Sequence, residues 1–445
     1  MVTLAQMLDA REARAIRQRE LLAEFGGTVV SFTMNVPGPV KTSPALRRAF
    51  GEGLYRLEDG LRAMGVRVLR REVSHPETGS LALAAVAGEA VDVKRLCVDI
   101  EDRDPLGRLF DLDVITPSGG IGREELGLPP RTCMVCGKAG RGCASRRVHP
   151  VDVLQARTGE ILREFFRERD SGALAAQAAR ALLYEVCTTP KPGLVDRANC
   201  GSHGDMDMFT FVDSAAALLP YFRQAAAVGM DTADLPRREA FQRLRAEGIR
   251  GERDMFRATG GVNTHKGAVF SLGLFCGAMG RLWSPAGFCR DLDRVLAECG
   301  ALAAEAACVD DGEMTAGQRI RRDHGLRGIL GEAAGGFPAA KAALEALEAA
   351  LDAGAAVEEA GVAALLGLMA RVEDTNLMAR GGLEGWRWAA EQAKALLAEG
   401  GIPRREAVEA LDRAFMERNL SPGGCADLLA MVYLLWFCGG EGDRE

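Results

Sequence analysis

The sequence lacks the features that would mark a membrane protein or a small secreted protein. Its longest apolar run near the C-terminal end, from Leu428 to Cys438, is much shorter than the roughly 20 residues that a helix needs to cross a bilayer. The first residues do not join a positively charged segment to an apolar one, as a secretory signal does. The 12 cysteines show no disulfide framework. We therefore expect no membrane partner and a cytoplasmic location.

An excess of positive charge is also lacking. Residues 1–170 contain 26 Lys and Arg against 24 Asp and Glu, and the remaining residues contain 29 against 38, for a net charge of −7. A nucleic-acid partner is not expected, because DNA and RNA are bound by strongly basic surfaces. Small anionic molecules can still be held by a few local Lys and Arg residues.

Aromatic residues make up only 6% of the chain, whereas Ala and Gly are abundant. This composition favours closely packed helices, above all in the second half. With 445 residues and 48% hydrophobic content, the chain is long enough for two folded domains. We place them at residues 1–169 and 170–445.

Residues 1–169 alternate between helix-like and strand-like patterns, which predicts an α+β domain. Helices are expected near 1–24 and 45–64, the second one starting after Thr42-Ser43-Pro44. Strands are expected at 29–36, 66–74 and 80–86, and residues 92–101 are expected to pass from helix to strand.

The second half shows no strand alternation, which predicts an all-α helical bundle. A helix over 151–169 is expected to end the first domain, with Asp170-Ser171-Gly172 as a linker. Further helices are expected near 173–185, 209–228, 236–259, 266–281, 289–306, 339–351, 361–372, 383–398, 404–419 and 426–437.

Three polar islands interrupt this helical pattern: residues 188–207, 259–267 and 374–382. The first island looks too polar for a core, and the prolines on either side of Lys191 make it too rigid for a linker. Each island alone could merely cap the helix that follows it. Three together predict one shared site for phosphates and a divalent ion.

The strings EVCTTPKPGLVDRANCGSHGDMD, TGGVNTHKGAVFSLGL and DTNLMARGG resemble the signature stretches of the triphosphoribosyl-dephospho-coenzyme A synthase family. The resemblance covers about residues 171–440. It implies that the substrates are ATP and 3′-dephospho-coenzyme A. The triphosphoribosyl group is transferred to a ribose 2′-hydroxyl, and adenine leaves.

This reaction needs a carboxylate beside a sugar cation, groups that move protons, and neutralisation of three phosphates. Residue types suggest Lys191 and Lys266 for phosphate, Asp205 and Asp207 for Mg²⁺, and His203 or His265 for proton transfer. The expected substrate-positioning residues are Asn199, Ser202, Asn263, Thr264, Asp374, Asn376 and Arg380. The glycine-rich stretch 312–337 reads as a loop; its residues Arg319, Arg322, His324 and Arg327 either contact phosphate or form a basic solvated connection.

In the first half, Asp111 and Asp113 alternate with Leu112 in a strand-like segment, so both carboxylates should share one face. Two such carboxylates can hold Mg²⁺ beside a phosphate, although a solvated strand edge would look the same. A basic island follows at 131–149. Arg108, Arg131, Arg141 and Arg146 are candidates for binding a triphosphate.

The string GRLFDLDV and the pattern R-x-C-x2-C-x6-C-x2-R-x2-H resemble the family that attaches the phosphoribosyl-dephospho-coenzyme A group to the acyl carrier protein, the γ subunit, of citrate lyase. The resemblance covers about residues 20–165. It implies a nucleotidyltransferase-like domain. Cys133, Cys136, Cys143 and His149 have a spacing that could hold zinc, although free reduced thiols fit the pattern as well.

Together these resemblances predict one chain that makes the citrate lyase prosthetic group and then attaches it to a carrier serine, with release of pyrophosphate. One alternative keeps the chemistry but serves the carrier subunit of malonate decarboxylase. Another makes one half a binding module that only recruits the carrier protein.

Overall fold

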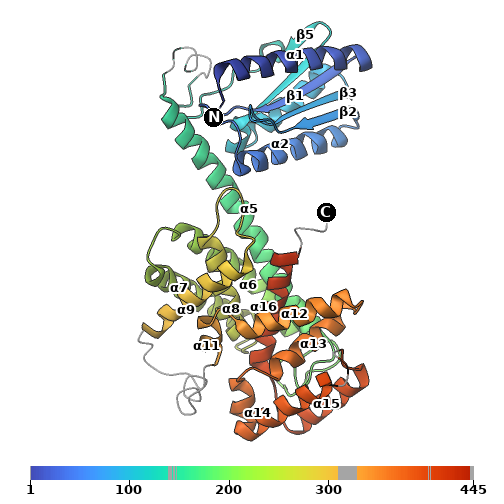
Figure 1. The fold of residues 1–445 in the computed structure, drawn as a ribbon, viewed down its shortest axis with the longest axis vertical. Helices are drawn as coiled ribbons and strands as arrows, with labels where there is room; N and C mark the ends of the chain where they lie inside the picture. The colour runs from blue at the N-terminus through green and yellow to red at the C-terminus, as the bar shows by residue number, and fades with distance from the viewer. Residues whose placement is uncertain are drawn as a thin grey trace. The chain divides into compact units, whose positions relative to one another are not determined.

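The computed structural model describes residues 2–138, 143, 146, 148–308, 328–398, 400 and 402–440. The chain forms two compact units, drawn in Figure 1. Unit 1 comprises Met1–Glu168 and Ser284–Gly287, and unit 2 comprises Arg169–Trp283 and Phe288–Glu445. Five residues with a predicted phosphate or site role lie outside the described residues: Arg141, Arg319, Arg322, His324 and Arg327.

Unit 1 is built on a five-stranded sheet with the order β2-β3-β1-β4-β5, in which all neighbours are antiparallel. The strands are β1 (Thr28–Met34), β2 (Arg67–Ser74), β3 (Leu81–Ala87), β4 (Phe110–Thr116) and β5 (Gly119–Ile121). Its helices are α1 (Leu4–Phe25), α2 (Pro44–Ala63) and α3 (Ala90–Asp102), with short 3-10 turns η1 (Pro105–Leu109) and η2 (Glu124–Leu126). The predicted α+β architecture of this part is confirmed.

Helices cover both faces of this sheet, with α1 on one side and α2 on the other (Figure 1). On the α1 side, Leu21 packs against Val29. On the α2 side, the Phe32 ring stacks on Phe50 at 4.6 Å and meets the Phe110 ring edge-on at 5.4 Å. Aromatic rings favour both arrangements. Gly53 lets α2 approach this closely, because a Cβ there would overlap the Phe32 ring.

The predicted helix-to-strand change at residues 92–101 is wrong. Helix α3 runs through to Asp102, and strand β4 begins only at Phe110. Buried side chains near both ends of α3 bind the backbone of β4: Lys94 donates to the Leu112 carbonyl at 2.8 Å, and Glu101 accepts the Leu112 N–H at 3.0 Å. These contacts with Leu112 stabilise α3 as a helix, although its sequence alone is compatible with both helix and strand.

The predicted linker at Asp170-Ser171-Gly172 is also wrong. A single helix, α5, spans Val151–Cys187. Asp170 and Ser171 are buried, and Asp170 accepts a hydrogen bond from the Trp283 indole at 2.7 Å. Asp and Ser favour turns because they can bond to nearby backbone, but here the carboxylate has a partner 113 residues away.

The described residues of unit 2 form helices joined by loops and contain no strand; the isolated bridge between Ser284 and Gly287 belongs to unit 1. The described helices are α6 (Met208–Asp231), α7 (Arg237–Ala258), α8 (Lys266–Arg281), α9 (Leu292–Ala304), η3 (Glu305–Cys308), α11 (Gly328–Ala334), α12 (Pro338–Asp352), α13 (Val357–Met369), α14 (Thr375–Ala398), α15 (Arg405–Glu417) and α16 (Gly423–Gly440). The expected helical architecture is confirmed. The prediction of a loop over residues 312–337 is wrong for residues 328–334, which form the short helix α11.

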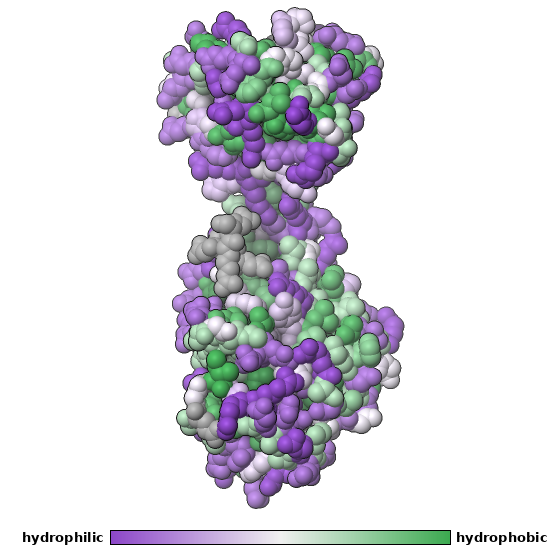
Figure 2. Space-filling view, turned by 90° about the vertical axis from the view of Figure 1, so that its right-hand side faces the viewer, coloured by the Kyte–Doolittle hydropathy of each residue, from purple (hydrophilic) through white to green (hydrophobic). Residues whose placement is uncertain are grey.

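Close packing of α6 and α8 follows from small residues at their contact. A Cβ added at Gly229 would overlap the carbonyl oxygen of Gly277, and one added at Gly280 would overlap that of Ala226. Such approaches need glycine. Among the described helices, none is both long and apolar enough to cross a bilayer, and the face drawn in Figure 2 mixes hydrophilic and hydrophobic residues in both units.

Candidate functional site

The carboxylates of Asp111 and Asp113 lie on one face of β4, as the alternation of the sequence predicts. Leu112 between them is buried in the core. Asp111 stands opposite Thr33 and Asp113 opposite Ser31 in the register with β1. This is the α1 side of the sheet, since Val29 on the same face of β1 packs against Leu21 of α1.

A cavity of about 970 Å³ opens beside these two carboxylates. A volume of this size suits a nucleotide-like ligand. Residues predicted to bind ligand or metal are among its lining: Arg108, Asp111, Asp113, Arg131, Cys133, Cys143 and His149. Arg146 is not among the lining residues. The cavity therefore brings together most of the candidates from the first half of the sequence.

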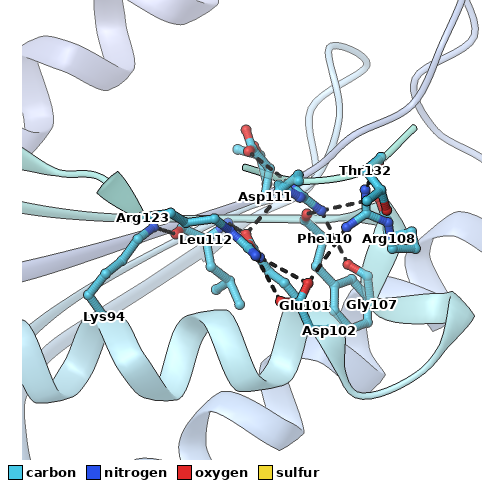
Figure 3. Close-up of polar contacts among 12 residues, drawn as sticks. Lys94, Glu101, Asp102, Gly107, Arg108, Phe110, Asp111, Leu112, Arg123 and Thr132 are labelled. Atoms are coloured by element: carbon cyan, nitrogen blue, oxygen red, sulfur yellow. Dashed lines mark hydrogen bonds and ion pairs between the residues drawn. The ribbon is translucent and has the colours of Figure 1, made fainter. Parts of the chain in front are cut away.

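Arg131 and Arg108 line this cavity and are bound by backbone carbonyls. Figure 3 shows Arg108 beside Thr132. Arg131 donates to the Phe110 carbonyl at 2.7 Å and lies 3.6 Å from the Asp111 carboxylate. Arg108 donates to the Thr132 carbonyl and lies 3.6 Å from the Asp102 carboxylate. Both guanidinium groups are thus held by contacts within the protein.

Two carboxylates behind the rim complete this arrangement and were missed by sequence reasoning. Glu101 is buried and forms an ion pair with Arg123 at 2.7 Å, and Arg123 also pairs with Asp102 at 2.7 Å. Glu101 lies 3.6 Å from Arg131 as well. Nothing in the helical pattern around Glu101 distinguishes it from a surface residue.

The charges that line the cavity favour a cation beside Asp113 and an anion beside Arg108. Partial desolvation, followed by the charge of Asp111, raises the pKa of Asp113, although its side chain keeps contact with solvent. A bound cation would relieve this repulsion. Burial and the neighbouring Arg131 lower the pKa of Arg108, and a bound phosphate would relieve that crowding.

The four predicted zinc ligands lie together. One ligand atom from each of Cys133, Cys136, Cys143 and His149 lies within 4.8 Å of all the others. The backbone N–H of Lys138 and then His149 lower the pKa of the Cys136 thiol to about 6. Cys136 in turn raises the pKa of Cys143 to about 11.

In unit 2, the first polar island is not the exposed loop that its polarity suggests. Residues 188–196 are all buried. Lys191 is 1% exposed, forms an ion pair with Glu185 and also donates to the Glu185 carbonyl at 2.8 Å. The ammonium group is therefore engaged inside the protein and does not face a phosphate site.

Other polar groups of this buried stretch are satisfied in the same way. Asp196 accepts backbone N–H groups from Lys191 at 2.9 Å and Ala198 at 2.7 Å. Asp412 accepts the Gly193 N–H at 2.8 Å and the Asn199 side-chain amide at 2.9 Å. Asn199 thus shapes the loop through Asp412, which sequence reasoning missed.

The later part of the first island is more open and contacts the third island. Arg380 donates to the Ser202 carbonyl at 2.8 Å and lies 3.2 Å from His203 Nδ1. The other ring nitrogen of His203 lies 2.9 Å from the Ser421 hydroxyl. Burial and the charge of Arg380 lower the pKa of His203, which favours the neutral imidazole.

The two candidate magnesium ligands of this island differ in their surroundings. Asp205 is 66% exposed, and its carboxylate lies 4.0 Å from His203. Asp207 caps α6: its carboxylate accepts the Thr210 N–H and hydroxyl, both at 2.9 Å. These hydrogen bonds lower the pKa of Asp207. A capping role is therefore shown for Asp207.

The second island forms the start of α8. His265 is buried and lies 2.7 Å from the Ser214 hydroxyl, which Thr264 also contacts at 2.7 Å. Burial and the charge of Lys191 lower the pKa of His265 to about 3. Lys266 and Asn263 reach the surface instead; the Lys266 side chain is 43% exposed and lies 3.2 Å from Glu252.

The third island opens α14. Asp374 is buried and accepts the N–H groups of Asn376 at 2.8 Å and Leu377 at 3.2 Å. Burial raises the pKa of Asp374. Asn376 is exposed. Gly382 at the end of the island has a φ of 65° and marks a break inside the helix.

One segment that was not predicted to be functional, Ser421–Asp427, contacts all three islands. Ser421 contacts His203 of the first island at 2.9 Å. The Cys425 N–H donates to Asp374 of the third island at 2.8 Å. Asp427 accepts the Ala268 N–H, just after the second island, at 3.0 Å. The predicted convergence of the islands is therefore observed, around the start of α16.

The sequence does contain a signal for this segment. Ser421-Pro422-Gly423-Gly424 precedes an apolar helix, and a glycine-rich turn that opens a helix is a common anion-binding element. Space is tight here: a Cβ at Gly267 would overlap the Asp427 carboxylate, and a Cβ at Gly423 would contact Asn376.

Comparison with known proteins gives matches along the chain. Residues 2–165 match the CitX family, described as apo-citrate lyase phosphoribosyl-dephospho-CoA transferase. Residues 171–442 match the CitG family, described as ATP:dephospho-CoA triphosphoribosyl transferase. Both resemblances seen in the sequence are thereby confirmed.

Individual relatives show the same division. A protein named CitXG from Haemophilus influenzae is 35% identical over 457 residues, which covers 98% of this chain and 97% of the relative. The CitXG protein of Leuconostoc mesenteroides subsp. cremoris is 33% identical over 462 residues, with the same coverage. A probable 2-(5''-triphosphoribosyl)-3'-dephosphocoenzyme-A synthase of Vibrio cholerae is 43% identical over 293 residues, 63% of this chain and 92% of the relative.

Proposed function

This chain belongs to the CitXG family, in which a CitX part precedes a CitG part, and from that premise we infer that it is a bifunctional transferase. It converts ATP and 3′-dephospho-coenzyme A into 2′-(5″-triphosphoribosyl)-3′-dephospho-coenzyme A and adenine. It then transfers the phosphoribosyl-dephospho-coenzyme A group to the citrate lyase acyl carrier protein. The observation that carries this conclusion is similarity to CitXG proteins over 98% of the chain.

We assign the synthase reaction to unit 2, at the convergence of the three islands. Four helices, α6, α8, α14 and α16, begin at or beside these islands. Helix N-termini carry partial positive charge and bind phosphate. Arg380 and Lys266, both solvent-accessible there, supply further positive charge for the triphosphate.

Proton transfer in this reaction falls to His203 in our proposal. Its lowered pKa keeps the imidazole neutral near pH 7, which suits a base that accepts the proton of the ribose 2′-hydroxyl. Asp205, 4.0 Å away, can face the sugar cation or a magnesium ion. Asn263, Asn376 and Ser202 are placed to position the riboses.

Buried and half-buried residues of the same region have a positioning role. Asp374 and Asp427 tie the starts of α14, α16 and α8 together. Lys191 with Glu185, and His265 with Ser214, support the loops from inside. We therefore place Lys191 and His265 behind the site.

We assign the transfer reaction to the cavity of unit 1 and propose a nucleotidyltransferase-like arrangement there. Asp111 and Asp113 offer the hard oxygen ligands that Mg²⁺ prefers, and their mutual repulsion fits a bound cation. Such an ion supplies charge neutralisation at the phosphates. Arg108 and Arg131 would hold the triphosphate while the carrier serine attacks the α-phosphate and pyrophosphate leaves.

For the recipient we propose the citrate lyase carrier, the γ subunit, because the description of the matched CitX family names citrate lyase. The carrier of malonate decarboxylase is the alternative recipient. A third reading, in which unit 1 only recruits the carrier, predicts capture without covalent change.

Three steps test this proposal with the full chain. The protein is incubated with ATP, Mg²⁺ and dephospho-coenzyme A, and adenine is measured by chromatography. Apo-carrier proteins of citrate lyase and malonate decarboxylase are then added separately and weighed by mass spectrometry. Adenine release that depends on dephospho-coenzyme A, followed by a mass increase of the citrate lyase carrier, supports the proposal. Absence of adenine from folded protein would refute the synthase assignment, and an unchanged carrier mass would refute the transferase assignment.

A further inference from the structure

The cluster of Cys133, Cys136, Cys143 and His149 in unit 1 has no role in the proposed transfer chemistry. We propose that Cys133, Cys136, Cys143 and His149 form a closed, four-coordinate zinc site that fixes the segment carrying Arg131 at the rim of the cavity. No step of the phosphoribosyl transfer uses a thiol, so the cluster needs a separate explanation.

The spacing of the four groups fits a metal rather than a disulfide. All four ligand atoms lie within 4.8 Å of one another, and the Cys136 and Cys143 sulfurs are 3.5 Å apart. Two thiolates bound to one tetrahedral zinc at about 2.3 Å each lie about 3.8 Å apart. Bonded disulfide sulfurs lie at about 2.05 Å.

The turn that carries the first two cysteines is shaped to hold thiolates. Gly137, with a φ of 71°, reverses the chain directly after Cys136. Its N–H donates to the Cys133 carbonyl at 3.0 Å, and the Cys133 N–H donates to the Lys138 carbonyl at 2.7 Å. The Val135 N–H lies 3.5 Å from the Cys133 sulfur. Amide N–H groups aimed at sulfur stabilise the deprotonated form that binds metals.

His149 provides an independent observation. Its Nε2 atom is buried and has no hydrogen-bond partner among the described residues. Buried polar atoms are normally paired, and a metal-binding histidine uses one ring nitrogen for the metal and the other for a supporting contact. The ring is therefore not explained as an ordinary structural histidine.

The place of the cluster suggests what the metal does. Four protein ligands leave no open coordination position, which is typical of structural zinc. Cys133, Cys143 and His149 line the same cavity as Asp111. Arg131 lies two residues before Cys133, and Arg108 donates to the carbonyl of Thr132 between them. A metal on Cys133 would fix the positions of both guanidinium groups.

The direct test is the metal content of the full-length protein, purified under reducing conditions without chelator. Elemental analysis is expected to give one zinc per chain. Cys136→Ser is expected to lose it, whereas the matched control Cys289→Ser, a partly buried cysteine of unit 2, keeps it. Because Cys136→Ser could misfold, the wild-type protein is also reconstituted with Co²⁺. The thiolate-to-cobalt absorption and the tetrahedral d–d bands report the ligand set without any variant.

A second readout tests the role, and it rests on the proposed function. Zinc is removed from wild-type protein with a chelator, the chelator is dialysed away, and Mg²⁺ is restored before assay. Carrier labelling from preformed triphosphoribosyl-dephospho-coenzyme A is then expected to fall about tenfold or more. Adenine release by unit 2 is expected to stay unchanged and serves as the control for folding. Zinc-containing protein without either activity would refute the proposed function and leave the site standing.

Two results would overturn the site, and a third would overturn its positioning role. The first is metal-free protein that fails to bind Co²⁺. The second is a Cys136–Cys143 disulfide in the active protein, detected by non-reducing mass spectrometry. The third is carrier labelling that does not change when the metal is removed, which would refute the positioning role.

Discussion

The two units present their polar residues in opposite ways. Unit 1 places Asp111 and Asp113 on one face of a strand beside an open cavity, with Arg108 and Arg131 at its rim. Unit 2 buries much of its most polar sequence, including Lys191, Asp196 and Asp374. In our proposal, the polar motif of unit 1 marks a ligand site directly, whereas much of the polar sequence of unit 2 forms the framework behind one.

This difference has a physical origin in the two architectures. A strand alternates its side chains, so one face can serve the core and the other a ligand. A helix start instead leaves backbone N–H groups without partners. In unit 2 carboxylates meet that need, as the buried Asp374 does for α14 and the half-buried Asp427 does for α8.

Breaking the buried ion pair of unit 2 should lower stability more than the other changes considered below. Lys191→Met leaves the Glu185 carboxylate buried without its partner, and the free energy of unfolding should fall by about 3–5 kcal/mol. Lys266→Met, at the exposed lysine, should change it by only about 0.5 kcal/mol. Urea denaturation followed by circular dichroism measures both. Adding Glu185→Gln to Lys191→Met should recover part of the loss. If Lys191→Met and Lys266→Met were equally stable, Lys191 would contribute no more to the stability of unit 2 than a surface lysine does.

The next effect concerns activity in unit 1. Asp111→Asn removes a charge that the proposed magnesium site needs, and carrier labelling should fall about 100-fold, which corresponds to about 2.7 kcal/mol of transition-state stabilisation. Adenine release should not change. Asp59→Asn, at an exposed position on α2, is the matched control. Wild-type labelling rates in Asp111→Asn would show that the exposed face of β4 is only a solvated surface.

A smaller effect should appear in the pH dependence of stability. Desolvation and then the charge of Glu185 raise the pKa of Asp427. The folded protein therefore binds the carboxyl proton of Asp427 more tightly than the unfolded chain does. Wild-type stability is therefore lost as pH rises from the ordinary pKa, about 3.9, to the raised one. Asp427→Asn has no such loss and keeps an oxygen for the Ala268 N–H.

The free energy of unfolding of Asp427→Asn, relative to that of the wild type, should thus increase with pH through this window and level off above it. Denaturant titrations at a series of pH values measure this difference. A difference that stays constant with pH would mean that Asp427 is not held in an environment that resists ionisation.

The smallest expected effect is a shift in a pH profile. The charge of Arg380 contributes to the lowered pKa of His203, so Arg380→Met should raise that pKa. If His203 accepts a proton in catalysis, the acid limb of the adenine-release profile should move to higher pH. Nuclear magnetic resonance titration of the His203 ring checks the pKa itself. An unmoved ring titration would contradict the electrostatic coupling.

The sequence predicted the site residues of unit 1 better than those of unit 2, because strand alternation is a local pattern and the buried contacts of unit 2 are not. The common face of Asp111 and Asp113 followed from the alternation of a single strand, and the convergence of three islands followed from their shared character. The burial of Lys191 could not be predicted, because it depends on the Glu185 carboxylate and carbonyl at the end of the preceding helix, which bind its ammonium group. The role of Asp427 depends on a contact with Ala268, 159 residues away.

The incorrect linker illustrates the same limit. Asp170-Ser171-Gly172 has the composition of a turn, yet α5 continues through it because Trp283 binds the Asp170 carboxylate. Local propensity decides such a segment only when no distant partner is available. The sequence patterns identified the kinds of structure reliably and left the long-range partners undetermined.

A complementation assay can show whether the two reactions belong to different units. Asp111→Asn and His203→Ala proteins are each incubated with ATP, Mg²⁺, dephospho-coenzyme A and apo-carrier, alone and mixed, and the carrier is weighed by mass spectrometry. Neither variant alone should label the carrier at more than a small fraction of the wild-type rate, Asp111→Asn should still release adenine, and the mixture should restore labelling. Loss of adenine release in Asp111→Asn, or no restoration on mixing even after added triphosphoribosyl-dephospho-coenzyme A, would contradict the assignment of the two reactions to different units.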